Sequence, residues 1–218
     1  MPSKVRITKE AIIDASMNLV REEGANALNA RGVAGRLGCS TQPIFSNYAV
    51  MEELRSDVIK AAERLYREYQ ERDMAKEAYP PYKASGMAYI RFAREEKELF
   101  KLLFMRDRSN EKIAERKEEI EDLIRLISRN AGLSEEEAYR FHIEMWLFVH
   151  GIAVMAATSY LEWDPETISG ILTDAYEGLK ARFQIRKASP FTGTTDSSME
   201  DGKWTRPLSA RKEKKEQI

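Results

Sequence analysis

Pro43 restricts the fold of this chain more than any other residue, because it stands in the stretch GCSTQPIFSNY, where the apolar spacing is helical. Inside a helix a proline removes a backbone hydrogen bond and clashes with the preceding turn, which costs about 3 kcal/mol. In a first turn the missing N–H has no intrahelical partner to lose. We therefore predict a short helix that begins abruptly, with Ser40 as its N-cap and Thr41, Gln42 and Pro43 as its first residues.

The residues before this stretch predict another short helix and a tight turn. Asn29 is a suitable cap for the helix, and Gly38 can adopt the positive φ that ends it. Two helices that cross at a wide angle need a small residue at their contact and a branched apolar residue on the second helix, which Ala34 and Ile44 supply. The spacing favours a helix-turn-helix, and an ordinary helical hairpin is the alternative. The predicted core of the helix-turn-helix is Val33, Ala34, Leu37, Gly38, Ile44 and Phe45.

Helical spacing continues along the rest of the chain, and no convincing pair of strands is present. We expect an all-α fold with further helices starting at Thr8 and ending before Gly24, and at about Met51–Asp73, Tyr82–Glu95, Glu98–Met105, Glu111–Asn130, Ser134–Tyr160 and Pro165–Ile185. The sequence Tyr79-Pro80-Pro81-Tyr82 breaks the pattern. Residues 1–50 are therefore predicted to form a small three-helix domain and residues 51–187 a larger helical domain that begins with a connecting helix, 51–73. Residues 188–218 are predicted to be a disordered tail.

Composition suits a soluble globular chain of 218 residues, with 43% hydrophobic and 33% charged residues and a net charge of −1. No apolar run is long enough to cross a membrane, and the N-terminal residues do not resemble a secretion signal. The single cysteine, Cys39, excludes an internal disulfide framework. We expect a cytoplasmic protein without a membrane partner.

In a helix-turn-helix, the start of the second helix enters the major groove of DNA. Glutamine and asparagine pair with adenine, and the threonine methyl meets the thymine methyl. Residues 1–50 carry a slight excess of positive charge, six basic against four acidic side chains, so phosphate contacts depend on the placement of individual groups. The predicted DNA-binding residues are Lys4, Arg6, Arg31, Ser40, Thr41, Gln42, Pro43, Ser46, Asn47 and Tyr48, with Tyr48 contributing its hydroxyl.

The stretch from Thr8 to about Leu54 resembles the DNA-binding domain of the TetR (tetracycline-repressor-like) family of bacterial transcriptional regulators. The resemblance is carried by LNARGVAGRLGCSTQPIFSNYAVMEEL, in which Phe45-Ser46-Asn47-Tyr48 matches the aromatic, two-residue, aromatic pattern that closes the family's recognition helix. The sequence departs from the family at Met51, where a phosphate-contacting lysine is common.

This resemblance implies a homodimer that pairs through its last two long helices and binds a palindromic operator in double-stranded DNA. It also implies a repressor that a small-molecule effector releases from DNA, acting without a cofactor. The region predicted to line the effector pocket comprises Tyr89, Phe92, Phe104, His142, Met145 and Trp146. His142 and His150 lie two helical turns apart, too far to share a metal ion, so no metal site is expected.

Two other functions remain compatible with the residues. The first alternative is a TetR-like DNA binder without a small-molecule effector. The second is a helical enzyme or carrier. We do not expect an enzyme, because the sequence has no nucleophile and base at a recognisable spacing, no phosphate-binding loop and no metal-ligand pattern.

Overall fold

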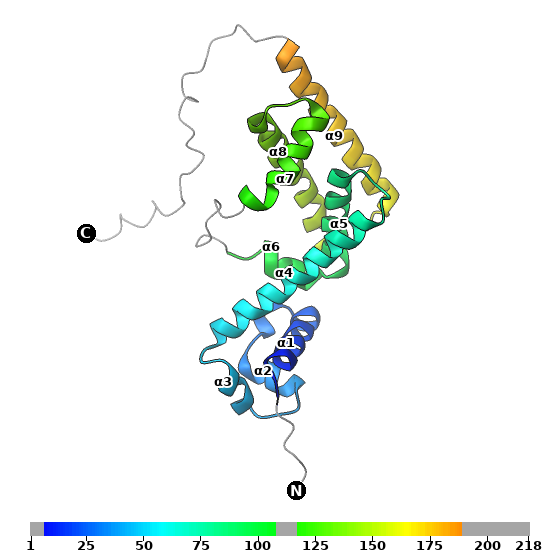
Figure 1. Cartoon of the computed structure of the whole chain (residues 1–218). Helices are drawn as coiled ribbons and strands as arrows, with labels where there is room; N and C mark the ends of the chain where they lie inside the picture. Colours follow the sequence, from blue (N-terminus) through cyan, green and yellow to red (C-terminus); the bar gives the residue numbers. More distant parts are fainter. Residues whose placement is uncertain (1–6, 108–116, 189–218) are drawn as a thin grey trace, which may run out of the picture.

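The computed structural model describes residues 7–107 and 117–188, and these form helices without strands. The all-α prediction is confirmed. The helices are α1 (Lys9–Glu23), a 3-10 turn η1 (Ala25–Ala27), α2 (Ala30–Arg36), α3 (Gln42–Asn47), α4 (Met51–Ala75), α5 (Pro81–Glu95), α6 (Lys97–Phe104), α7 (Lys117–Ala131), α8 (Glu135–Ala157) and α9 (Pro165–Ala188). Figure 1 shows α1 to α3 gathered at one end, with the long α4 leading from them to the remaining helices.

The predicted caps position the first two helices. The Thr8 side chain accepts a hydrogen bond from the Ala11 amide and begins α1, and the Asn29 side chain accepts one from the Gly32 amide and begins α2. Gly38 has a φ of 64°, and the Cys39 amide bonds back to the Ala34 carbonyl. This is the glycine-dependent helix end that the sequence predicts, and it turns the chain toward α3.

Helix α3 begins slightly later than predicted. Its N-cap is Thr41 rather than Ser40, so Gln42 is its first residue and Pro43 its second. The prediction that Pro43 lies in the first turn is confirmed. The one-residue shift places the proline even closer to the helix start, where its missing N–H leaves no intrahelical bond unmade.

The burial of Phe45 and Tyr48 is the reverse of what was predicted. Ile44 is fully buried and Tyr48 is 2% exposed, whereas Phe45 is 53% exposed. Residues four apart share one face of a helix, so Tyr48 follows Ile44 into the core and Phe45 turns outward. The assignment of Phe45 to the helix-turn-helix core is therefore wrong. Of the other predicted core residues, Val33 and Ala34 are buried, and Leu37 packs partly buried against them.

Helix α4 joins the two ends of the molecule. Leu54, Val58, Ala62 and Tyr69 are buried along its length. They belong to one hydrophobic cluster that also contains buried residues of α1, α2, α3, α5 and α6. The core is thus continuous across position 50, and the division of the chain into two domains stays a prediction.

The C-terminal helices pack mainly on α8, which contacts α5, α6, α7 and α9. Ser134 and Glu137 form a reciprocal capping box that starts α8, as the sequence predicts. A second, smaller hydrophobic cluster lies between α7, α8 and α9 and includes Ile127, Phe141 and Phe183. The predicted start of the helix at Glu111 and the predicted tail lie outside the described residues. None of the helices in the described part of the chain could cross a membrane.

The adjacent residues Ile44 and Phe45 provide a test of this packing. We expect Ile44→Ala to lower the free energy of unfolding by about 2–5 kcal/mol, because it removes a buried branched side chain and leaves a cavity. Phe45→Ala should lower it by less than about 1 kcal/mol, because that ring is mostly exposed. Urea denaturation of both variants measures the difference, and equal losses would contradict the observed orientation of α3.

Candidate nucleic-acid interface

One face of α3 is open to solvent on the side of the molecule away from α5–α9 (Figure 1). Gln42, Phe45 and Ser46 are exposed and follow the spacing of a single helical face. The opposite face holds Ile44 in the core. The chain therefore presents a short, rigidly supported helix whose outer surface carries one amide, one aromatic ring and one hydroxyl.

Two of the predicted DNA-contacting side chains are bonded to their own helix. The Ser46 hydroxyl donates to the Gln42 carbonyl at 2.9 Å, and the Asn47 amide donates to the Pro43 carbonyl at 2.8 Å. The Asn47 amide also lies 3.5 Å from the carbonyl of Ile7, which ties α3 to the chain just before α1. Both side chains stabilise α3, and Asn47 is only partly exposed.

Tyr48 lies inside the molecule instead of on its surface. Burial and the nearby Asp57 carboxylate raise the pKa of its hydroxyl to about 12. The Lys9 ammonium stands 4.6 Å from the centre of the Tyr48 ring and 4.0 Å from a carboxylate oxygen of Asp57. Half of the Lys9 side chain remains exposed, so the buried ring holds a cation at the start of α1, beside α3.

The basic residues near α3 differ in how far their charge is already neutralised. Arg36 makes two hydrogen bonds to the Glu22 carboxylate. Arg31 is exposed at the start of α2, and the described residues provide it with no ion pair. Thr41 is half-buried and Ser40 exposed, whereas Lys4 and Arg6 lie outside the described residues. Arg31 and Lys9 are thus the cations available beside α3.

The residues predicted to line an effector pocket separate into two groups. Tyr89 contacts Phe104 with ring centres 5.0 Å apart, and Phe92 joins them through Tyr66. Trp146 stacks on His150, whose Nδ1 atom lies 2.8 Å from the Tyr89 hydroxyl oxygen. These residues form one aromatic group around α5 and α8.

His142 and Met145 lie in the second group. The His142 Nδ1 atom is 3.2 Å from the Tyr82 hydroxyl, and Met145 belongs to the smaller hydrophobic cluster. Burial lowers the pKa of His142, which favours its neutral form. The structure therefore does not bring the six predicted residues together around one cavity, and the role of each in binding a ligand stays a prediction.

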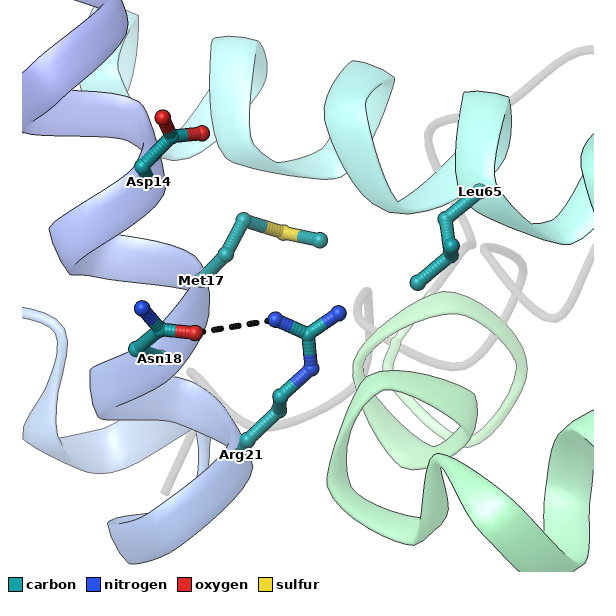
Figure 2. Close-up of a pocket in the computed structure, with 5 residues that line it drawn as sticks. All are labelled: Asp14, Met17, Asn18, Arg21 and Leu65. Atoms are coloured by element: carbon teal, nitrogen blue, oxygen red, sulfur yellow. Dashed lines mark hydrogen bonds between the residues drawn. The ribbon is translucent and has the colours of Figure 1, made fainter.

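Two hollows lie away from these aromatic residues. One, of about 320 Å³, is lined by Asp14, Met17, Asn18, Arg21 and Leu65, where α1 faces α4. Figure 2 shows Met17 and Arg21 reaching from α1 toward Leu65, with the Arg21 guanidinium bonded to Asn18. The other, of about 210 Å³, lies between the end of α4, α5 and the start of α9. Within the described ranges, no three His, Cys, Asp or Glu side chains are grouped as metal ligands.

Comparison with known proteins finds a similarity in the C-terminal part of the chain. Residues 82–176 match the model of the tetracyclin repressor-like C-terminal domain. The C-terminal part of the chain is therefore similar to the corresponding domain of TetR-like regulators. Its fold is similar to the crystal structure of a TetR-like transcriptional regulator from Rhodococcus sp. RHA1, with a TM-score of 0.57 and 14% identity over 85% of this chain and 98% of that one. A search of curated proteins finds no significant match.

The family match and the helix-turn-helix lie in different parts of the chain. The TetR match begins after α4, within α5, whereas the exposed face of α3 belongs to the N-terminal region from which the resemblance was drawn. The structural similarity covers both regions. The TetR fold, with an N-terminal helix-turn-helix and further C-terminal helices, is thereby confirmed.

Two residues of the candidate interface were missed in the sequence. Phe45, predicted to lie in the core, directly follows Ile44 and points outward, whereas the four-residue spacing from Ile44 to Tyr48 places Tyr48 on the inner face. Lys9 is not among the DNA-binding residues that the sequence predicts. Its position over the Tyr48 ring depends on a contact between residues far apart in the sequence, which no local pattern contains.

His142 predicts a pH dependence of stability. Its folded-state pKa lies below the unfolded value of about 6.5, so the unfolded chain binds more protons as pH falls through this range. The stability due to the neutral ring is complete above about pH 6.5 and is lost progressively below it. We expect His142→Gln, which keeps an acceptor for Tyr82, to lose less stability than the parent chain between pH 7 and 5. Identical thermal-unfolding profiles over this range would contradict the assignment.

Proposed function

We propose that this chain is a homodimeric, sequence-specific DNA-binding regulator that acts as a repressor on a palindromic operator and is released by a small molecule. The observation that carries the proposal is the outer face of α3. Gln42, Phe45 and Ser46 are exposed on this face, while Ile44 and Tyr48 anchor the helix in the core. A helix held in this way can enter the major groove without losing its own support.

Within the proposed interface, the side chains have different tasks. Gln42 at the start of α3 is free to make a bidentate contact with adenine, and Thr41 and Phe45 offer apolar atoms to thymine methyl groups. Ser46 and Asn47 support the helix through their internal bonds. We propose that the backbone of Ser40 and Pro43 also approaches the DNA, because these residues lie at the start of α3 beside Gln42.

Phosphate contacts position such a helix and require exposed cations. Arg31 and Lys9 meet this need at the starts of α2 and α1. We also propose phosphate contacts for Lys4 and Arg6, which precede α1 in the sequence. Met51 leaves the start of α4 without a cation, so we assign phosphate anchoring to Arg31 and Lys9 and give Tyr48 the role of holding Lys9 in place.

Dimerisation is proposed through α8 and α9. Leu147 is 58% exposed and Phe148 43% exposed, on a helix that is otherwise well packed. Gly151, one turn further along α8, and Gly170 and Gly178 on α9 have open space where a side chain would stand, among the described residues. Exposed apolar residues beside glycines suit close approach by a second pair of helices. Two copies would then present two α3 helices to two half-sites of an operator.

Release by a ligand is proposed as a population shift between DNA-binding and non-binding arrangements of the dimer. We divide the chain accordingly into a DNA-binding part, residues 1–50, and a ligand-binding and dimerisation part, residues 51–187. Helix α4 transmits the change, because the same buried stripe contacts both parts. The proposed protein is a cytoplasmic regulator without catalytic activity.

Gln42 and Ser46 give a matched test of DNA reading. In selection of bound DNA from a random pool, Gln42→Ala should lose preference at one base pair in each half-site, at a cost of about 1–3 kcal/mol for the preferred base. Ser46→Ala should retain the parent preference, because that hydroxyl is bonded to the Gln42 carbonyl. If the parent chain selects no sequence at all, the DNA-binding function is wrong.

Leu147 tests the dimer independently of DNA. We expect Leu147→Glu to be monomeric in light scattering, because two carboxylates would enter an apolar contact, and to bind a palindromic site at least tenfold more weakly. Met74→Glu is the matched control, since Met74 is 43% exposed but lies on α4. A Leu147→Glu protein that remains a dimer would place the subunit contact elsewhere.

A further inference from the structure

The 210 Å³ hollow between α4, α5 and α9 combines an apolar wall with charged side chains. Met87 and Ile90 of α5 and Ile168 of α9 line it and belong to the main hydrophobic cluster. Its volume is below the range of about 300–1,000 Å³ found for drug-sized ligands, so it fits a smaller molecule. The hollow lies apart from the aromatic residues that the sequence predicted as a pocket.

The charged side chains that line this hollow are predominantly cationic. Lys76, Arg91 and Arg94 face a single lining carboxylate, Asp73, which gives the lining a net charge of +2. Asp73 is itself paired, at 3.0 Å with Lys76 and at 2.9 Å with Arg91. Arg94 is partly buried, and the structure records no hydrogen bond or ion pair for it within the described part of the chain.

Arg91 has a donor that the surrounding protein does not satisfy. Its Nε atom donates to Asp73, its Nη1 atom lies 3.8 Å from Glu95, and its guanidinium carbon stands 4.6 Å from the centre of the Tyr69 ring. The Nη2 nitrogen is buried, and no acceptor among the described residues lies within hydrogen-bond distance. A buried guanidinium donor without an acceptor is unfavourable, so a shift of the Arg91 side chain that brings Nη2 to an anion in the hollow would remove that cost.

We propose that this hollow binds a small organic carboxylate with a short apolar tail. The carboxylate oxygens accept from Arg91 and Arg94, and the tail packs on Met87, Ile90 and Ile168. An inorganic anion would leave the apolar wall uncovered, and an uncharged molecule would leave the arginines without an acceptor. Glu95 does not line the hollow, and its carboxylate is engaged by the Tyr69 hydroxyl at 2.9 Å.

The position of Asp73 connects this site to α4. Asp73 lies near the end of α4 and Arg91 on α5, so their ion pair holds the two helices together at the hollow. A bound carboxylate competes with Asp73 for Arg91 and weakens this connection. The proposal of a binding site depends only on the geometry of the hollow. The proposal that the ligand weakens DNA binding depends on the proposed function.

Calorimetry of the full chain with hexanoate, hexanamide and 1-hexanol tests the site directly. Hexanoate should bind, and the two uncharged probes should bind at least tenfold more weakly because they cannot satisfy the arginines. Arg94→Gln should weaken hexanoate binding about tenfold or more, the loss expected for one charge-assisted contact. Arg67→Gln, an exposed position on α4 outside the hollow, is the matched control and should bind as the parent does.

Several outcomes would overturn the assignment. Equal binding of all three probes would show that the hollow does not select a carboxylate, and unchanged binding by Arg94→Gln would place hexanoate elsewhere. Absence of any heat with hexanoate, at concentrations that saturate a millimolar site, would refute the proposal outright. Thermal unfolding of Arg94→Gln without ligand checks that the variant is folded.

A separate measurement distinguishes the site from the regulatory role. Fluorescence anisotropy with the selected operator should show hexanoate lowering DNA affinity for the parent chain and for Arg67→Gln, but not for Arg94→Gln. Hexanoate that binds in calorimetry without changing DNA affinity would retain the site and refute its coupling to DNA. Failure of the parent chain to select DNA would refute the proposed function and leave the calorimetric result intact.

Discussion

The packing of α4 on both ends of the molecule is the constraint on which the other features depend. Its first half is buried through Leu54 and Val58 in the region of α1 to α3, and its second half through Tyr69 against α5. At 1.5 Å per residue, its 25 residues span about 37 Å. The helix is continuous, and its buried residues pack against both ends of the molecule.

A second connection limits how α4 can move. Arg21 of α1 donates from Nε to one Glu96 carboxylate oxygen at 2.8 Å and from Nη2 to the other at 3.2 Å. This bidentate ion pair connects α1 to the junction of α5 and α6. The N-terminal unit is therefore held both through α4 and through this ion pair. The 320 Å³ hollow lined by Arg21 lies between α1 and Leu65 of α4 (Figure 2). Motion of α4 relative to α6 would change the distance between Arg21 and Glu96, and through this ion pair it would also move α1.

The sequence predicts most of the helices, because their signals are local. Thr8, Asn29, Gly38 and Ser134 each act within a few residues of the backbone that they cap or terminate, and the structure confirms all four. Burial within a six-residue helix was harder to predict. In a helix of a turn and a half, the inner face is marked by a single spacing, from Ile44 to Tyr48, and not by a pattern that repeats along the helix.

The candidate sites were less predictable than the fold for the same reason. The six residues chosen for a pocket are aromatic or polarizable, and such residues mostly fill a core, as Tyr89 and Phe92 do here. The hollow beside Arg91 is formed by residues from three helices, and its distinguishing feature is a donor left without an acceptor. No spacing in the sequence can indicate a missing hydrogen bond, since the absence depends on every neighbour at once.

The charged contact between Asp73 and Arg91 is better suited to switching than the apolar core around it. Apolar packing changes gradually with separation, whereas an ion pair with 2.9 Å geometry is either made or replaced by another anion. A ligand shifts a two-state equilibrium only by its differential affinity for the two states, and a carboxylate that competes with Asp73 for Arg91 would bind more tightly to the state in which that ion pair is open. A tilt of roughly 5° at one end of a 37 Å helix moves the other by about 3 Å. That is close to the spacing of one base pair, about 3.4 Å along the DNA axis, so under the proposed function a tilt of this size would shift α3 by about one base pair.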